Sequence, residues 1–309
     1  EVLSYNSSAL RLLGAREQDA RQSVLALNRS ESFQRTVEKV LGGQHVISNQ
    51  EFQGITCQVA ANPVFQEGKV TGAVILILDV TEKMKGEQMR REFTANVSHE
   101  LKTPLTSISG FAEIINDGFV KPEDTKKFAG RIFKEAQRLI TLVNDVIKIS
   151  QLDEGKLPYE KEEVDLYEAV RETFLRIEDH AKAEGVHLYL YGPHIKSNTV
   201  KTILDEIIYN LCDNGIKYNK KGGSLTVTIS QEGEKPVVTV EDTGIGISEE
   251  DQKRIFERFY RVDKSHSKAI GGTGLGLSIV KHGTMFLGAD MKVESTLGEG
   301  SKFTLILPE

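Results

Sequence analysis

The sequence predicts an α+β protein of several domains, because its apolar residues follow a different pattern in each of three stretches. Residues 1–81 combine short helical segments with strands, residues 82–155 carry two long helical patterns, and residues 158–309 alternate helices with strands. The chain has 309 residues, of which 39% are hydrophobic and 27% are charged, a composition typical of globular domains. We therefore expect a small α/β domain, a two-helix hairpin and a larger α/β domain.

The first stretch ends in two predicted strands, EFQGITCQVAANPVF and GKVTGAVILILDVT, which the loop QEGK joins as a hairpin. Its apolar run GAVILILDV is much shorter than the ~18 residues that a membrane-spanning helix needs, so we expect it to form a buried strand. This pattern indicates a small α/β domain of the sensor type.

The second stretch has apolar residues every three or four positions, which predicts two amphipathic helices. They are Phe93, Val97, Leu101, Leu105, Ile108, Phe111 and Ile115 in the first helix, and Phe128, Ile132, Ala136, Leu139, Val143, Val146 and Ile149 in the second. Pro122 suits the first turn of the second helix. Two antiparallel helices cannot bury both stripes alone, so we expect a symmetric dimer that forms a four-helix bundle. The alternative is that the stripes pack on another domain of the same chain.

The third stretch predicts helices from about 165 to 184, from about 199 to 218 and from about 275 onward. Between and after them lie the predicted strands VHLYLY, SLTVTIS, PVVTVED, MKVEST and SKFTLIL. Asp165 and Glu168 have the spacing of a helix cap with a reciprocal acid.

The segment NVSHELKTPL, residues 96–105, places His99 beside Glu100 in the first long helix. A zinc helix needs a second histidine four residues after the first, and this position holds Thr103, so a metal site is not expected. Glu100 can hydrogen-bond one ring nitrogen of His99 and leave the other nitrogen as a nucleophile. The alternative is an ordinary exposed histidine.

The segment YNLCDNGIKY, residues 209–218, places Asn210, Asn214 and Lys217 on roughly one helix face. An amide oxygen suits Mg²⁺ that also keeps water and phosphate ligands, and a lysine beside it neutralises phosphate charge. The alternative is an ordinary polar helix face.

Two glycine-rich loops follow, EDTGIGIS at 241–248 and GGTGLGLS at 271–278. Asp242 ends a strand, where its carboxylate can accept from the amino group of adenine, and Gly244 and Gly246 permit close backbone approach. The second loop opens a helix whose backbone N–H groups can hold phosphate. Neither loop matches GxGxxG and no GxxxxGK[ST] is present, so a dinucleotide fold or a P-loop is not expected.

The segment between the loops, EEDQKRIFERFYRVDKSHSKAI, combines an aromatic anchor with cations. Ser248 and Asp251 predict the cap of a short helix, and Arg258 and Arg261 supply positive charge. A mobile lid that offers arginine to a γ-phosphate fits this pattern; an ordinary surface loop is the alternative.

The order of these motifs resembles that of the sensor histidine kinases of two-component systems, and is most similar to the PhoR/WalK type. The segment FTANVSHELKTPLTSI resembles their H-box, NLCDNGIKY the N-box, DTGIGI and GGTGLGLSIVK the two G-boxes, and FERFYRVD the F-box. The resemblance covers residues 82–309. Residues 1–81 resemble a PAS domain with a truncated first strand, followed by the segment DVTE at 79–82.

The resemblance implies a role for each matching residue. His99 would be phosphorylated by ATP, Glu100 would orient it, and Thr103 would position water for hydrolysis of a phosphorylated response regulator. Either Arg258 or Arg261 would approach the γ-phosphate. The implied nucleotide site contains Asn210 as the Mg²⁺ ligand, Asn214, Lys217, Tyr218 and Asp242, with Gly244, Gly246, Gly272, Thr273, Gly274, Leu275 and Gly276 lining the nucleotide and the lid hinges.

The implied domains are a PAS-like sensor domain at 1–81, a helical hairpin for dimerisation and histidine phosphotransfer at 82–155, and an α/β-sandwich ATP-binding domain of the Bergerat (GHKL) type at 158–309. The implied cofactors are ATP and Mg²⁺, and the implied partners are a second copy of the chain and the receiver-domain aspartate of a response regulator. The resemblance also implies phosphatase activity and a bacterial membrane sensor of which this chain is a cytoplasmic portion. An alternative is a GHKL-type ATPase without phosphohistidine chemistry, and a third class is a nucleotide-binding scaffold without turnover. The net charge of −6 argues against direct nucleic-acid binding.

Overall fold

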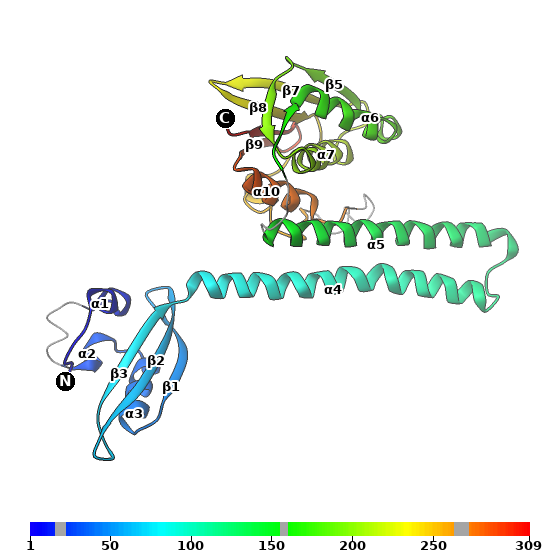
Figure 1. Ribbon diagram of the computed structural model, residues 1–309. Helices are drawn as coiled ribbons and strands as arrows, with labels where there is room; N and C mark the ends of the chain where they lie inside the picture. The colour runs from blue at the N-terminus through cyan, green and yellow to red at the C-terminus, as the bar shows by residue number, and fades with distance from the viewer. Residues whose placement is uncertain (16–22, 155–159, 263–271) are drawn as a thin grey trace. The chain divides into compact units, whose positions relative to one another are not determined.

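The computed structural model describes residues 1–15, 23–154, 160–262 and 272–309 (Figure 1). Its contacts divide the chain into two units, Glu1–Ala95 and Asn96–Glu309. Helix α4 (Thr81–Asn116) begins in the first unit and ends in the second. The expected combination of a helical hairpin with α/β structure is confirmed, while the predicted domain boundary at 155–158 lies outside the described residues.

The first unit contains a three-stranded antiparallel sheet of β1 (Val46–Phe52), β2 (Ile55–Gln66) and β3 (Lys69–Asp79), in that order. Among the described residues before it are the helices α1 (Ser7–Leu13), α2 (Val24–Leu27) and α3 (Glu31–Leu41). Phe33 and Val37 of α3 pack on Cys57 and Val59 of the central strand, and all four side chains are buried. The buried face of the sheet therefore forms the core of this unit with α3.

The prediction of one strand over EFQGITCQVAANPVF was wrong at its beginning. Gln53 and Gly54 have φ values of 51° and 77°, so they turn the chain between β1 and β2. Glu67 and Gly68, with φ of 52° and 76°, turn it again in the predicted QEGK loop. Two consecutive residues with positive φ are typical of the type I′ turn, whose twist matches that of the strands. The first turn has glutamine where asparagine is usual, which hides it in the sequence.

In the second unit, α4 and α5 (Thr125–Glu154) form the predicted hairpin, with Pro122 at the start of the short 3₁₀ helix η2 (Pro122–Asp124). Near the turn, Phe111 and Phe128 meet edge to face with centroids 5.7 Å apart, and the Arg131 guanidinium lies over both rings. These contacts lock the end of the hairpin by aromatic and cation–π interactions.

Helix α5 has two apolar surfaces with different surroundings. Ile149 is fully buried, and Leu152 packs on the core of the α/β domain, so the alternative of packing within one chain applies to the last turns of α5. Phe133, Ile140 and Ile147 are 66%, 51% and 49% exposed. Their seven-residue spacing is that of helices which pack side by side in a bundle.

The α/β domain is built on a five-stranded sheet in the order β5 (His187–Tyr191), β7 (Ser224–Glu232), β8 (Lys235–Asp242), β10 (Gly300–Ile306) and β9 (Asp290–Thr296). Only β5 and β7 run parallel among these neighbours. Helices α6 (Leu166–Glu184), α7 (Lys201–Lys217) and α10 (Gly276–Leu287) pack on one face, where Leu225, Val227 and Ile229 of β7 are buried (Figure 1). A second pair of strands, β4 (Glu162–Asp165) and β6 (Lys196–Thr199), was not predicted.

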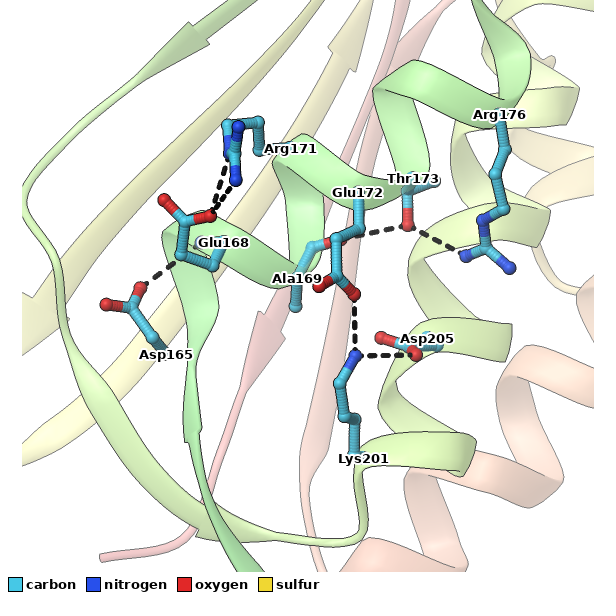
Figure 2. Close-up of polar contacts among 9 residues, drawn as sticks. All are labelled: Asp165, Glu168, Ala169, Arg171, Glu172, Thr173, Arg176, Lys201 and Asp205. Carbon is cyan, nitrogen blue, oxygen red and sulfur yellow. Dashed lines mark hydrogen bonds and ion pairs between the residues drawn. The ribbon is translucent and has the colours of Figure 1, made fainter.

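Polar contacts cap the beginning of α6 and join α6 to α7 (Figure 2). The Asp165 carboxylate accepts from the backbone N–H of Glu168 at 3.2 Å, as its cap role predicts, whereas the Glu168 carboxylate binds Arg171 at 2.7 Å. Lys201 of α7 donates to Glu172 of α6 at 2.7 Å. These contacts hold α7, which carries the predicted N-box residues, against α6.

No helix among the described residues is both long and apolar enough to cross a lipid bilayer.

Candidate functional site

His99 lies on α4 with its side chain 81% exposed. Its Nδ1 is 4.0 Å from Oε1 of Glu100, and the other oxygen of that carboxylate is 3.7 Å from the Arg138 guanidinium of α5. The Thr103 hydroxyl donates to the carbonyl oxygen of His99 at 3.3 Å. The Glu100 carboxylate therefore stands between an exposed imidazole and a cation that can orient it.

Arg138 was not predicted as a site residue. It follows Glu100 by thirty-eight positions in the sequence, and only the antiparallel packing of α4 and α5 brings the two together. No local motif in the sequence signals such a pair.

Asn210 lies on α7 and faces the loop that opens α10. Its side-chain N–H donates to the Glu206 carbonyl at 2.8 Å, so the amide oxygen is the atom that can accept a hydrogen bond or bind a cation. A methyl group on Gly276 would lie 2.9 Å from that oxygen and 3.8 Å from the Asn214 side-chain nitrogen. Glycine at 276 therefore keeps open the space in front of both asparagines.

Lys217, on the last turn of α7, forms an ion pair with Asp213, and the same carboxylate lies 3.4 Å from Nδ1 of His180 on α6. Asp213 is only 15% exposed. The structure thus gives Lys217 a carboxylate partner that the sequence analysis did not assign.

Asp242, at the end of β8, turns its carboxylate back onto the first glycine loop and accepts from the Gly244 N–H at 2.8 Å. Burial raises the pKa of this carboxyl, and the Gly244 hydrogen bond partly opposes the rise. A methyl group on Gly244 would lie 2.7 Å from the Asp242 carboxylate and collide with the Tyr218 carbonyl. The next residue, Ile245, donates its N–H to that same carbonyl at 3.0 Å.

Gly246 has a steric role of its own in the first glycine loop. Its φ is 67°, and a methyl group there would collide with the carbonyl of Thr296 on β9. The Gly298 N–H donates to the Ile245 carbonyl at 2.7 Å. Gly246 therefore seats the first glycine loop on the β9–β10 hairpin.

The second glycine loop lies near both Tyr218 and the lid. A methyl group on Gly272 would lie 3.8 Å from the Tyr218 hydroxyl. Gly274 has φ of 74°, and its carbonyl accepts from the Phe259 N–H at 2.9 Å. Leu275 is fully buried and so belongs to the core. Thr273 donates its hydroxyl to Asp145 of α5 at 2.8 Å, a contact that was not predicted.

The segment predicted to form a lid begins with the expected short helix, α8 (Glu249–Gln252), whose N-cap Ser248 accepts from the Asp251 N–H. Arg258 donates to both Asp153 oxygens of α5, at 2.7 and 2.8 Å. The rest of the predicted lid, residues 263–271, lies outside the described residues.

Arg261 differs from Arg258 in its surroundings. Its terminal nitrogen NH2 is buried without a hydrogen-bond partner among the described residues. Burial lowers the pKa of its guanidinium, while the nearby negative charge of Glu100 opposes that shift. A buried donor without a partner is costly unless a ligand satisfies it.

The structure thus brings Asn210, Asn214 and Gly276 together, and it joins Tyr218, Gly244 and Asp242 at the neighbouring end of β8. Glycines where a methyl group would collide, a carboxylate at a strand end and side-chain amides suit a bound nucleotide with its cation.

Comparison with known proteins agrees with these two centres. Residues 89–155 match the family "His Kinase A (phospho-acceptor) domain", and residues 199–309 match the family "Histidine kinase-, DNA gyrase B-, and HSP90-like ATPase". The chain is 33% identical over 322 residues to sensor histidine kinase WalK of Bacillus subtilis (strain 168). That match covers 99% of this chain and 52% of the relative, so the chain spans about half of that protein's length.

Two solved structures have a similar fold. A full-length ShkA in complex with AMPPNP is 26% identical with a TM-score of 0.53, over 72% of this chain and 45% of that one. Histidine kinase ThkA, solved in complex with the response regulator protein TrrA, is 23% identical with a TM-score of 0.57, over 99% of this chain and 91% of that one.

An exposed histidine beside an oriented carboxylate lies in the region that matches the phosphoacceptor family, and the glycine loops lie in the region that matches the ATPase family. The chain belongs to the sensor histidine kinases.

Proposed function

We propose that this protein transfers the γ-phosphoryl group of ATP to its own His99 and then to an aspartate of a response regulator. The observation that carries the proposal is the placement of the Glu100 carboxylate between Nδ1 of His99 and the Arg138 guanidinium, at 4.0 and 3.7 Å. The first distance is longer than a hydrogen bond, and such contacts often tighten only when substrate is bound. The exposed ring is accessible to a nucleotide and to a second protein.

In this mechanism, Glu100 accepts a hydrogen bond from Nδ1–H of His99 and so keeps the lone pair on Nε2. A bond forms between Nε2 and the γ-phosphorus, and the bond from that phosphorus to the bridging oxygen of ADP breaks. The positive charge that develops on the ring lies beside the Glu100 carboxylate, which can take the Nδ1 proton. Positioning and charge stabilisation supply most of the rate enhancement in such transfers.

The nucleotide is assigned to the space between the N-box helix and the two glycine loops. Asp242 would accept from the adenine amino group beside Tyr218, with Lys217 near the phosphates. Asn210 would hold Mg²⁺, since its amide oxygen faces open space at Gly276. The ion would neutralise phosphate charge.

Arg261 is the better candidate for the γ-phosphate than Arg258. Its NH2 group has no hydrogen-bond partner among the described residues, and it lies within the electrostatic range of Glu100. Arg258 is already bonded to Asp153.

The finer predictions extend this proposal. Residues 1–81 would be the sensor domain, of the PAS type, and the hairpin would pair with a second copy in a four-helix bundle. The exposed side chains of Phe133, Ile140 and Ile147, which were not in the predicted stripe, would contribute to that bundle. Thr103, one turn from His99, would position water for phosphatase activity toward the phosphorylated regulator. The chain would be the cytoplasmic portion of a membrane-anchored bacterial sensor.

The proposal is tested by incubating the protein with Mg²⁺ and γ-labelled ATP, unchanged and as His99→Gln. The matched control is His187→Gln, which removes another exposed histidine. We expect protein-bound label that is acid-labile and alkali-stable, retained by His187→Gln and lost in His99→Gln. Free phosphate released equally by all three proteins, with no bound label, would contradict the proposal and favour a GHKL-type ATPase.

A further inference from the structure

Two polar side chains outside the predicted site join the end of α7 to the first glycine loop. Asn219 follows the C-cap residue of α7, and Thr243 follows Asp242 at the end of β8. The Thr243 hydroxyl donates to the side-chain oxygen of Asn219 at 3.2 Å, and it accepts from the backbone N–H of Ser224 at 2.8 Å. We call Asn219 and Thr243 the loop bridge.

The half-buried side chain of Asn219 uses its whole hydrogen-bonding capacity. Its nitrogen donates to the carbonyl oxygens of Gly215 at 2.8 Å and Ser224 at 2.9 Å, and its oxygen also accepts from the Lys220 N–H at 2.9 Å. Carbonyl groups on one side and donors on the other determine the orientation of the amide. The amide therefore links the last turn of α7, the start of β7 and the first glycine loop in one fully satisfied network.

Two glycines permit the close packing around the loop bridge. A methyl group on Gly223 would collide with the side-chain oxygen of Asn219 and lie 2.7 Å from the Thr243 hydroxyl. A methyl group on Gly215 would lie 3.5 Å from Cβ of Asp242. The end of α7 and the loop bridge therefore pack directly against the strand end that carries Asp242.

The loop bridge sets the spacing of the two residues that the proposed function gives to the base of the nucleotide. Asn219 directly follows Tyr218 in the chain. Thr243 directly follows Asp242 in the same way. A second link runs beside the first, since the Ile245 N–H donates to the Tyr218 carbonyl at 3.0 Å. Contacts outside the base site therefore hold the end of α7 and the end of β8 at a fixed separation.

A carboxylate that cannot shift distinguishes adenine from a purine of the same shape. Adenine offers an amino group from which the Asp242 carboxylate can accept. Hypoxanthine has an oxygen in place of that amino group and carries its proton on the neighbouring ring nitrogen, so the carboxylate must move to reach a donor. A site that is built to receive an N–H group rejects an analogue that lacks it, because its polar group is left unpaired.

We propose that Asn219 and Thr243 are specificity-determining positioning residues: their hydrogen bond holds Asp242 in the place that selects an aminopurine over an oxopurine. The inference rests on the proposed function for the assignment of Asp242 to adenine. Both side chains act through the backbone beside the base site, and neither is assigned a contact with the nucleotide.

The test measures the affinity of the full chain for ADP and for IDP, its hypoxanthine analogue, by titration calorimetry with Mg²⁺. Diphosphates are used because they carry no γ-phosphoryl group to transfer. The unchanged protein should bind ADP at least about tenfold more tightly than IDP. Thr243→Val removes the hydroxyl and keeps the shape of the side chain. It should lower this selectivity by about two- to tenfold, the range that one net hydrogen bond supplies.

Two further variants separate positioning from loss of folding. Thr243→Ser keeps the hydroxyl and should keep the selectivity. Asn219→Asp turns a second carboxylate oxygen toward the carbonyls of Gly215 and Ser224, so it should lower the selectivity as Thr243→Val does. Because both changes break the same contact, the two together should lower it little further than either alone. The matched control is Thr239→Val, which removes a hydroxyl from β8 outside the loop bridge and leaves the selectivity unchanged.

The outcomes separate this inference from the proposed function. A merely structural role would weaken the binding of both nucleotides by the same factor, so unchanged selectivity in Thr243→Val and Asn219→Asp would overturn the inference. ADP and IDP that bind the unchanged protein equally would contradict the assignment of Asp242 to adenine, and the inference with it. Selectivity that is lost in both variants, while no variant forms phosphohistidine, would support the loop bridge and contradict the proposed kinase reaction.

Discussion

Alanine substitutions at Gly246 and Gly233 test whether the first glycine loop needs a glycine where it approaches β9, with Gly233 as the matched control. Both have a left-handed backbone, with φ of 67° and 63°. They differ in what a methyl group would meet: at Gly246 it would collide with the Thr296 carbonyl, whose carbon is 2.7 Å away, and at Gly233 it would meet nothing within 4 Å. The pair therefore separates backbone strain from steric collision.

Gly233→Ala should lower the free energy of unfolding by roughly 1–2 kcal/mol, because an alanine is unfavourable in a left-handed backbone conformation. Gly246→Ala should lower the free energy of unfolding by the same amount and by roughly 1–3 kcal/mol more, because the collision forces the first glycine loop and the β9–β10 hairpin to shift. For a domain of this size, each kcal/mol lowers the melting temperature by about 2–4 °C. Gly246→Ala is thus expected to melt about 2–12 °C below Gly233→Ala.

The assay is scanning calorimetry of the full chain, following the transition that ATP moves to higher temperature. The nucleotide affinity of Gly246→Ala should also fall, because the displaced loop carries Gly244 and the residues around Asp242, while that of Gly233→Ala stays unchanged. Equal melting temperatures for the two variants would refute the reasoning that Gly246 is required by its approach to β9.

Two further predictions concern α5 and α10. Ile140→Glu should convert the dimer to a monomer in sedimentation equilibrium, because it places a charge in the exposed apolar row. Glutamate at a polar position of the same helix should leave the dimer intact. A dimer that persists in Ile140→Glu would argue against a bundle through this face. His282 is packed with Asp153, Arg258 and Lys281, and burial lowers its pKa although Asp153 opposes the shift. The contact of His282 with Asp153 and Arg258 therefore disfavours the proton, so its contribution to the free energy of unfolding should be complete above the ordinary pKa of about 6.5 and lost as the pH falls below it. The melting temperature should fall between pH 7.5 and 5.5 by a component that His282→Gln abolishes, and an identical pH profile in that variant would contradict this.

The sequence alone predicts the bounds of those helices and strands whose hydrophobic periodicity is regular over many residues. The two helices of the hairpin, α7 and the strands of the five-stranded sheet follow the predicted ranges closely, because each buries one continuous face. The turn at Gln53 and Gly54 was missed because glutamine carries no turn signal. Strands β4 and β6 were missed because four residues are too few to show alternation.

The candidate site was predictable only within each motif. His99, Asn210 and Asp242 could be identified from their neighbours in the chain. Arg138 and the contacts of Asp145, Lys148 and Asp153 on α5 could not, since their partners lie far away in the sequence and depend on how the helices pack. Gly246 looked like a nucleotide residue because its motif is glycine-rich, whereas its geometry is set by a contact with β9.

The position of Pro104 in the continuous helix α4 affects the backbone next to His99. It runs without interruption from Thr81 to Asn116, and the eighteen residues from Thr81 to His99 rise roughly 27 Å. Its proline, Pro104, follows His99, so the missing amide hydrogen falls on the C-terminal side of that residue. The helix before His99 is therefore not broken by a proline. Pro104 cannot donate to the carbonyl of Glu100, the residue next to His99, so the helix backbone is most easily distorted directly beside that imidazole.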